Sequence, residues 1–258
     1  MTARIRSIAF NTFREAVRDR VLYNLIVFAL LMVGSSLLMG QITIGIQRQL
    51  VINLGLTAIS IFGVLIAIFI GIGLVSKEIE KRTVYTVLTR PVRRWEFIVG
   101  KFFGLAGTLV VNAALMAIGF FGALLFLMHS FQKSDVYLLV AIYFVLLQFM
   151  IVTSVALLFS SFSTPILSAV FTFSIFVIGS FSEDLRGFAG MTQGPTRWLA
   201  TALSFLLPNF SALNVISSVA HDQPVAGSLI LYNTVYALAY AAALISAASL
   251  IFQHRSMK

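Results

Sequence analysis

The sequence predicts an all-α, polytopic membrane protein with six transmembrane helices. Of its 258 residues, 59% are hydrophobic and only 10% are charged, and the mean hydropathy is +0.99. Soluble domains carry about 25% charged residues, so this composition excludes an ordinary soluble protein. Long apolar runs fill most of the chain and leave no stretch for a separate soluble domain. We therefore expect residues 1–258 to form a single transmembrane domain.

Six apolar runs are long enough to cross about 30 Å of hydrocarbon at about 1.5 Å per residue. None of them contains Asp, Glu, Lys, Arg or His. The first run is longer than the apolar core of a signal peptide, so we expect it to be retained as a span. The predicted spans are residues 21–39, 51–75, 102–128, 137–159, 165–181 and 228–252.

Residues 2–20, before the first span, predict an amphipathic helix. Its apolar residues recur at helical spacing: Ile5, Ile8, Ala9, Phe13 and Ala16. Arg4, Arg14 and Arg18 fall mostly on the opposite side. A helix with this pattern lies in the membrane interface.

Residues 198–220 are apolar, but Pro208 and Asn209 divide them. Proline breaks a helix, and each half of about ten residues is too short to span. We expect short extracytoplasmic re-entrant helices here, before the last span, rather than a seventh span. The stretch 182–197 contains three glycines and a proline, which indicates an irregular loop.

The basic residues predict the orientation. With a cytoplasmic N-terminus, fourteen of the 18 Lys and Arg residues lie inside, and the remaining four lie outside with four of the acidic residues. The charged residues predicted outside are Arg48, Lys133, Arg186, Arg197, Asp135, Glu183, Asp184 and Asp222. This bias predicts a multi-pass protein of the cytoplasmic membrane with both termini cytoplasmic. The basic inner face suits the anionic headgroups of the lipid bilayer rather than nucleic acid.

No catalytic or metal-binding residue is predicted. The spans lack the ionisable groups that ion-coupled carriers and intramembrane proteases use, and the chain has no cysteine. It also lacks the G-x-x-x-x-G-K-[ST] phosphate-binding loop, so it cannot hydrolyse ATP by that route. Three neutral polar residues lie within the spans and predict either hydrogen bonds between helices or ligands of a carrier: Asn112, Gln148 and Asn233.

The stretch 76–101 is the most polar part of the chain and the longest predicted cytoplasmic loop. Residues 78–89 can form a short helix with Val84, Val87 and Leu88 on one side, which Pro91 then ends. From these residues alone, two interpretations stay open. The loop is either a docking surface for a soluble partner or a basic segment lying on anionic lipid.

The end of this loop leads into the third span. Trp95 and Phe97 are expected to anchor the re-entry at the membrane interface, and Lys101 is expected to reach toward the headgroups. Gly100 and Gly104 match the G-x-x-x-G pattern of close helix contacts, which includes dimer seams.

Three stretches carry a family resemblance. They are FREAVRDRVLY at 13–23, the loop from EIEKRT to the Gly-Lys pair at 78–101, and LLPNFSALN at 206–214. In the loop, the Glu-rich start, Thr, Leu, Pro-Val, Arg and Gly-Lys occur in the order and spacing of the family. Many relatives have Gly where this chain has Arg82. The chain resembles the type-2 ABC exporter permease family, in particular the small six-span permeases of nitrous-oxide-reductase maturation and gliding motility.

The resemblance implies a coupling helix at 78–89 that docks into a separate ATP-binding-cassette ATPase subunit. ATP and Mg²⁺ would be bound by that partner, and this chain would hold no cofactor. It also implies a dimer with a second permease copy, identical or different, and export as the transport direction. Val84, Val87 and Leu88 are then the expected buried docking contacts. The charged residues expected to orient the partner are Glu78, Glu80, Arg82, Arg90, Arg93 and Arg94.

Two other functions stay open at this point. The chain could be a membrane scaffold or assembly factor that recruits a soluble partner through 76–101 without transport. It could also be an ATP-independent carrier that uses the neutral polar residues of its spans.

Overall fold

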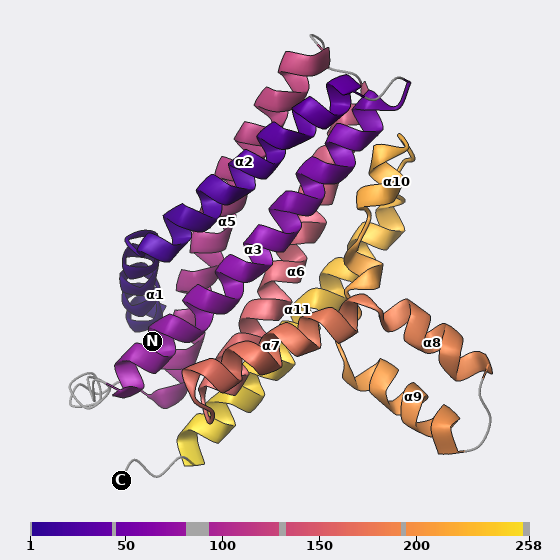
Figure 1. Ribbon diagram of the computed structural model, residues 1–258. Helices are drawn as coiled ribbons and strands as arrows, with labels where there is room; N and C mark the ends of the chain where they lie inside the picture. Colours follow the sequence, from indigo (N-terminus) through magenta and orange to yellow (C-terminus); the bar gives the residue numbers. More distant parts are fainter. Residues whose placement is uncertain (1, 43–44, 81–92, 129–132, 192–194, 255–258) are drawn as a thin grey trace.

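Every regular element of the described chain is a helix. The computed structural model describes residues 2–42, 45–80, 93–128, 133–191 and 195–254. Figure 1 shows long helices standing side by side, with α8 and α9 projecting from the side of the bundle. Large apolar side chains cover the outer faces, among them Ile118, Phe126 and Ile166. This confirms the predicted fold class, a polytopic all-α membrane protein.

Four helices in the described residues are long and apolar enough to cross a membrane. They are α3 (Gln47–Glu80), α5 (Arg94–Met128), α6 (Val136–Ser160) and α11 (Gly227–His254). Two bent helix pairs raise the number of crossings to as many as six. One pair is α1 (Thr2–Val17) with α2 (Arg20–Ile42), bent by 61°, and the other is α7 (Pro165–Ser180) with α8 (Ser182–Met191), bent by 59°.

Two helices are longer than the spans predicted from hydrophobicity. α3 includes the predicted span 51–75, and α5 includes 102–128. Both extend by several residues toward the 76–101 loop, because Lys, Glu and Arg continue a helix as well as apolar residues do. The hydrophobic run therefore marks the part that crosses the membrane and not the whole helix.

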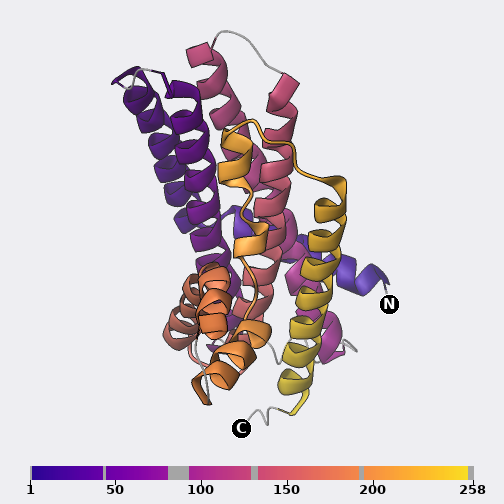
Figure 2. The ribbon, with the colours of Figure 1, turned by 90° about the vertical axis from the view of Figure 1, so that its right-hand side faces the viewer.

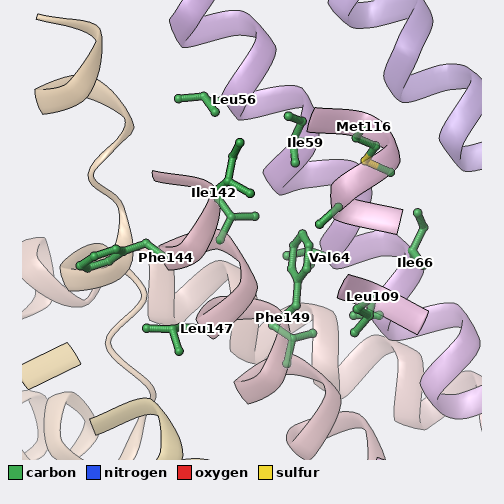
Figure 3. Packing of buried hydrophobic residues seen from close by; sticks show 14 of the residues in the cluster. Leu56, Ile59, Val64, Ile66, Leu109, Met116, Ile142, Phe144, Leu147 and Phe149 are labelled. Atoms are coloured by element: carbon green, nitrogen blue, oxygen red, sulfur yellow. The ribbon is translucent and has the colours of Figure 1, made fainter. Parts of the chain in front are cut away.

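The core forms around α3 and α6, whose apolar segments are each 72% buried. Glycines of α3 receive large side chains from the neighbouring helices. The ring of Phe120 from α5 lies against Gly55, and the ring of Phe149 from α6 lies against Gly63, each filling the space that a Cβ atom would occupy. Figure 3 shows Phe149 pointing toward the helix that carries Val64. A side chain at either glycine would separate the helices.

α1 packs across α5 instead of extending α2. A Cβ at Gly100 would lie 2.7 Å from Cβ of Ile8, and one at Gly104 would lie 2.5 Å from the Ala9 carbonyl oxygen. The G-x-x-x-G pattern therefore serves a contact within the chain, not a dimer seam. Figure 2 shows α1 in the half of the bundle that also carries the C-terminus.

The stretch after α7 differs from the prediction of an irregular loop over 182–197. Ser182–Met191 forms α8, and Pro195–Leu206 forms α9. The acidic residues Glu183 and Asp184 lie in the first turn of α8, where a helix dipole stabilises negative charge. The glycines that suggested a loop are tolerated inside this short exposed helix.

Residues 198–220 are divided at Pro208, as predicted. α9 ends at Leu206, and the chain continues as a 3-10 helix, η2 (Ser211–Leu213), and a short helix, α10 (Ile216–Ala220). The Asn209 side-chain oxygen accepts hydrogen bonds from Ser182 Oγ, at 2.5 Å, and from the Ala212 amide, at 3.1 Å. The Asn209 amide donates to the Tyr236 hydroxyl of α11 at 2.8 Å. These bonds fix the corner between α8 and α11.

Three connections meet at one end of the bundle through Arg48. Arg48 Nη2 lies 2.7 Å from Asp135 Oδ1, before α6, and 3.3 Å from Asp222 Oδ1, after α10. It also donates to Ser134 Oγ at 3.1 Å. The Arg48 and Asp135 side chains are only 14% and 8% exposed. These residues, which charge distribution predicts on one side of the membrane, lie at one end of the molecule.

Gly104→Ala is expected to loosen α1. The new methyl group would meet the backbone of Ala9 and Cβ of Thr12, neither of which can move without shifting α1. Overpacking of this kind costs about 1–3 kcal/mol, so amide exchange in α1 should be roughly tenfold to hundredfold faster. Gly107→Ala is the matched control, because its nearest neighbour is the Phe13 ring at 3.5 Å. Equal exchange in both variants would contradict the proposed packing.

Arg48→Met is expected to destabilise the protein by about 3 kcal/mol, because it removes the guanidinium that lies 2.7 Å from the buried Asp135 carboxylate. Asp222→Asn should cost less than about 1 kcal/mol, because the Asp222 side chain is 46% exposed and its contact is longer. Thermal unfolding of the purified variants in one detergent measures both. Equal loss in the two variants would show that the Asp135 contact is not the dominant one.

Candidate functional site

The predicted docking loop is bounded by two long helices that lie in the core. α3 ends at Glu80, and α5 begins at Arg94. Five of the predicted docking residues lie outside the described residues: Arg82, Val84, Val87, Leu88 and Arg90. The other four lie at the helix ends, Glu78 and Glu80 in the last turn of α3, and Arg93 and Arg94 at the start of α5. Their predicted contacts with a partner stay predictions.

The start of the predicted coupling helix differs from the structure. A separate helix was expected to begin at Glu78, but residues 78–80 continue α3 without a break. Residues 76–80 contain no Gly or Pro, and Lys and Glu have high helix propensity, so nothing in them ends α3. The position of residues 81–92 relative to α3 is outside the described residues.

α5 begins with a side-chain cap. The Arg93 amide donates to Glu96 Oε2 at 3.0 Å, which is the reciprocal half of a capping box. Glu96 is only 2% exposed, and its charge lies in the first turn of the helix, where the dipole favours it. This cap fixes where the loop ends and the helix begins.

The first turns of α5 are also attached to the end of α11. Phe97 stacks on Phe252, with ring centroids 5.8 Å apart and planes 15° apart. Ile98 and Ala248 complete this buried cluster. The expected interfacial position of Phe97 is therefore wrong, because the C-terminal helix covers it.

Lys101 was expected to reach toward lipid headgroups, and this is wrong as well. Lys101 is 1% exposed. Its Nζ lies 3.9 Å from Glu15 Oε2 of α1 and 5.7 Å from the centroid of the Phe97 ring. Sequence reasoning missed this burial because it placed α1 in the interface and not on α5. The signal that could have found it is the glycine pair on both sides of Lys101.

The neutral polar residues of the spans are mostly bonded within the chain. Gln148 Oε1 accepts from Ser60 Oγ of α3 at 3.2 Å. Asn233 Nδ2 of α11 donates to the Ala212 carbonyl of η2 at 3.1 Å. For these two residues the hydrogen-bonding interpretation is confirmed. Asn112 is buried in α5, and its Nδ2 has no hydrogen-bond partner among the described residues.

At one end of the bundle, α1, α5 and α11 are thus held together next to the helix ends that flank the predicted docking loop. Comparison with known families gives one match, to the ABC-2 family transporter protein model, over residues 6–257. No curated relative matches the chain. The matched region includes α1, the loop and the last span, so the resemblance seen in the sequence covers nearly the whole molecule. The chain belongs to the ABC-2 family of transporter proteins and is a membrane permease subunit of an ABC transporter.

Proposed function

We propose that this permease exports its substrate and is driven by a separate ATP-binding-cassette ATPase subunit that docks on residues 76–101. The partner binds ATP and Mg²⁺, and this chain contributes no catalytic residue. Two permease copies, identical or different, work on two ATPase subunits. The family match supports the permease role, and the further steps are our inference.

The observation that carries this proposal is the continuity between the loop and the core. Both ends of residues 81–92 join helices of 34 and 35 residues, α3 and α5. These helices interlock through Gly55 and Phe120. Because packed interiors resist compression, a push on the loop would displace whole helices and would not be absorbed locally.

A second element would move with them. α1 is joined to α5 by the Gly100 and Gly104 contacts and by the pair of Lys101 and Glu15. α11 is joined to α5 by the stacking of Phe97 on Phe252. Docking at the loop would therefore act on α1, α3, α5 and α11 together.

We infer that the loop end faces the cytoplasm. The N-terminal helix, the C-terminal end of α11, the end of α3 and the start of α5 lie in the same half of the bundle (Figure 1). The Arg48, Asp135 and Asp222 cluster lies at the other end. The basic residues concentrate at the first end, which the positive-inside rule assigns to the cytoplasm of a cytoplasmic-membrane protein.

Leu88→Asp is expected to weaken docking, because it places a charge on the apolar side predicted to be buried in the ATPase. Recovery of the ATPase subunit with the tagged permease should fall about tenfold, as for an interface hot spot. Stimulation of ATP hydrolysis by the permease should fall in parallel. Thr86→Asp is the matched control, because it adds the same charge on the opposite side of the predicted helix and should change recovery less than about twofold.

The same purification distinguishes the other functions. Equal recovery with Leu88→Asp and Thr86→Asp would contradict the docking assignment. A stoichiometric partner without ATPase activity would identify a scaffold or assembly factor. Substrate movement in liposomes that contain this chain alone, without ATP, would identify a carrier.

A further inference from the structure

A groove of about 560 Å³ lies between α1 and α5. This volume is within the range of small-molecule binding sites, about 300–1,000 Å³. The residues that matter for its chemistry are Arg6, Phe10, Phe13, Phe103, Gly104 and Gly107. None of them belongs to the predicted docking loop.

The groove is amphipathic along α1. Arg6, Phe10 and Phe13 have the spacing i, i+4 and i+7, so they follow one side of the helix. Arg6 is exposed, and Phe10 is 66% exposed. The groove therefore has a cation, Arg6, at one end, followed by the aromatic rings of Phe10 and Phe13 along the same side of α1.

The floor of the groove on α5 has little side-chain volume. Gly104 is closed by α1, but a Cβ at Gly107 would meet only the Phe13 ring, at 3.5 Å. Phe103, 56% exposed, forms the opposite wall. Beyond Gly107 the same side of α5 continues with exposed Val110 and Ile118. The groove therefore opens onto a strip of apolar surface along the helix.

The charge at the head of the groove is not balanced by an acidic residue in the part of the chain that the structure describes. Among the described residues, no ion pair of Arg6 is present. Glu15, the one acidic residue of α1, lies near Lys101. An anionic group could approach Arg6 without displacing a carboxylate.

We propose that this groove binds an anionic phospholipid of the bilayer. Its phosphate lies against the Arg6 guanidinium, and one acyl chain lies between the Phe10 and Phe103 rings over Gly107. The occupant must be both anionic and apolar, and the groove opens onto a helix face that is exposed to lipid in a membrane protein. An anionic phospholipid meets both conditions. This binding does not depend on the proposed ATPase partner.

The test measures lipid binding to the full-length protein in detergent by native mass spectrometry, with dioleoylphosphatidylglycerol and dioleoylphosphatidylcholine as probes. Arg6→Gln should weaken binding of the anionic lipid about fivefold and that of the zwitterionic lipid less, because its choline cation already offsets the phosphate charge. Arg14→Gln removes another exposed charge from the same helix, outside the groove, and should change binding less than about twofold. An equal effect of the two substitutions would overturn the proposal.

A second pair of variants tests the acyl-chain site. Gly107→Leu fills the groove and should weaken binding of both lipids by about fivefold or more. Gly122→Leu, on the same helix where no atom lies within 4 Å of the new Cβ, should change neither. Unchanged binding in Gly107→Leu contradicts the proposal. Displacement of the lipid by inorganic phosphate would also contradict it, because the groove would then bind free phosphate. Dissociation of two copies of the protein in Gly107→Leu, with lipid binding unchanged, would contradict it too, because the groove would then be a contact between copies.

Discussion

Helices within a bilayer gain little from the hydrophobic effect between them, because lipid tails are as apolar as Leu side chains. Close contact must hold them together, and in this protein glycine provides it. Gly55 and Gly63 let Phe120 and Phe149 reach the backbone of α3, so α5 and α6 are both fixed to that helix. Gly104 does the same for α1 on α5. The ends of α3 and α5 that flank the predicted docking loop depend on these contacts.

The two ends of the bundle are held together by different forces. At the loop end, the contacts are buried and apolar, as in the stack of Phe97 on Phe252, with Lys101 enclosed beneath α1. At the other end, one arginine joins three connections through ion pairs, and Asp222 is half exposed. The half-exposed contact of Asp222 contributes little free energy, whereas breaking the buried pair of Arg48 and Asp135 or the buried aromatic stack is costly. Each end is therefore fastened by at least one buried contact, aromatic at the loop end and ionic at the Arg48 end.

The sequence alone predicted most of the fold because hydrophobicity and proline act locally. The charge-free runs mark the long helices, and Pro208 divides the segment before α11 as expected. The failures concern contacts between distant segments. Lys101 and Phe97 are residue types that commonly lie at the membrane interface. Both are buried, because α1 covers Lys101 and α11 covers Phe97. The prediction of a loop at residues 182–191 was wrong for a different reason. Two acidic residues in the first turn of α8 favour a helix, and the glycines that indicated a loop do not prevent it. Of the candidate site, the structure describes only the flanking helices, which extend further toward residues 81–92 than predicted, and the docking contacts stay predictions because they depend on a partner.

The segment from α7 to α10 shows how an interrupted helical segment can still pass along the bundle. α7 starts beside the end of α6 and has 16 residues, about 24 Å at 1.5 Å per residue, so it does not by itself make the crossing predicted for residues 165–181. The chain then leaves through α8 and α9 and returns to η2 and α10, and Asp222 just beyond α10 lies at Arg48. Broken backbone at membrane depth is tolerated only where its polar groups are bonded within the protein. Here the Phe210 amide donates to the Gly179 carbonyl at 3.1 Å, and Ser211 Oγ donates to the Ser180 carbonyl at 2.7 Å. Gly179 is required for this junction, since a Cβ there would lie 2.5 Å from the Pro208 carbonyl oxygen. α7 and the η2–α10 segment are thus joined side to side by backbone contacts between distant residues, which hydrophobic length alone could not predict.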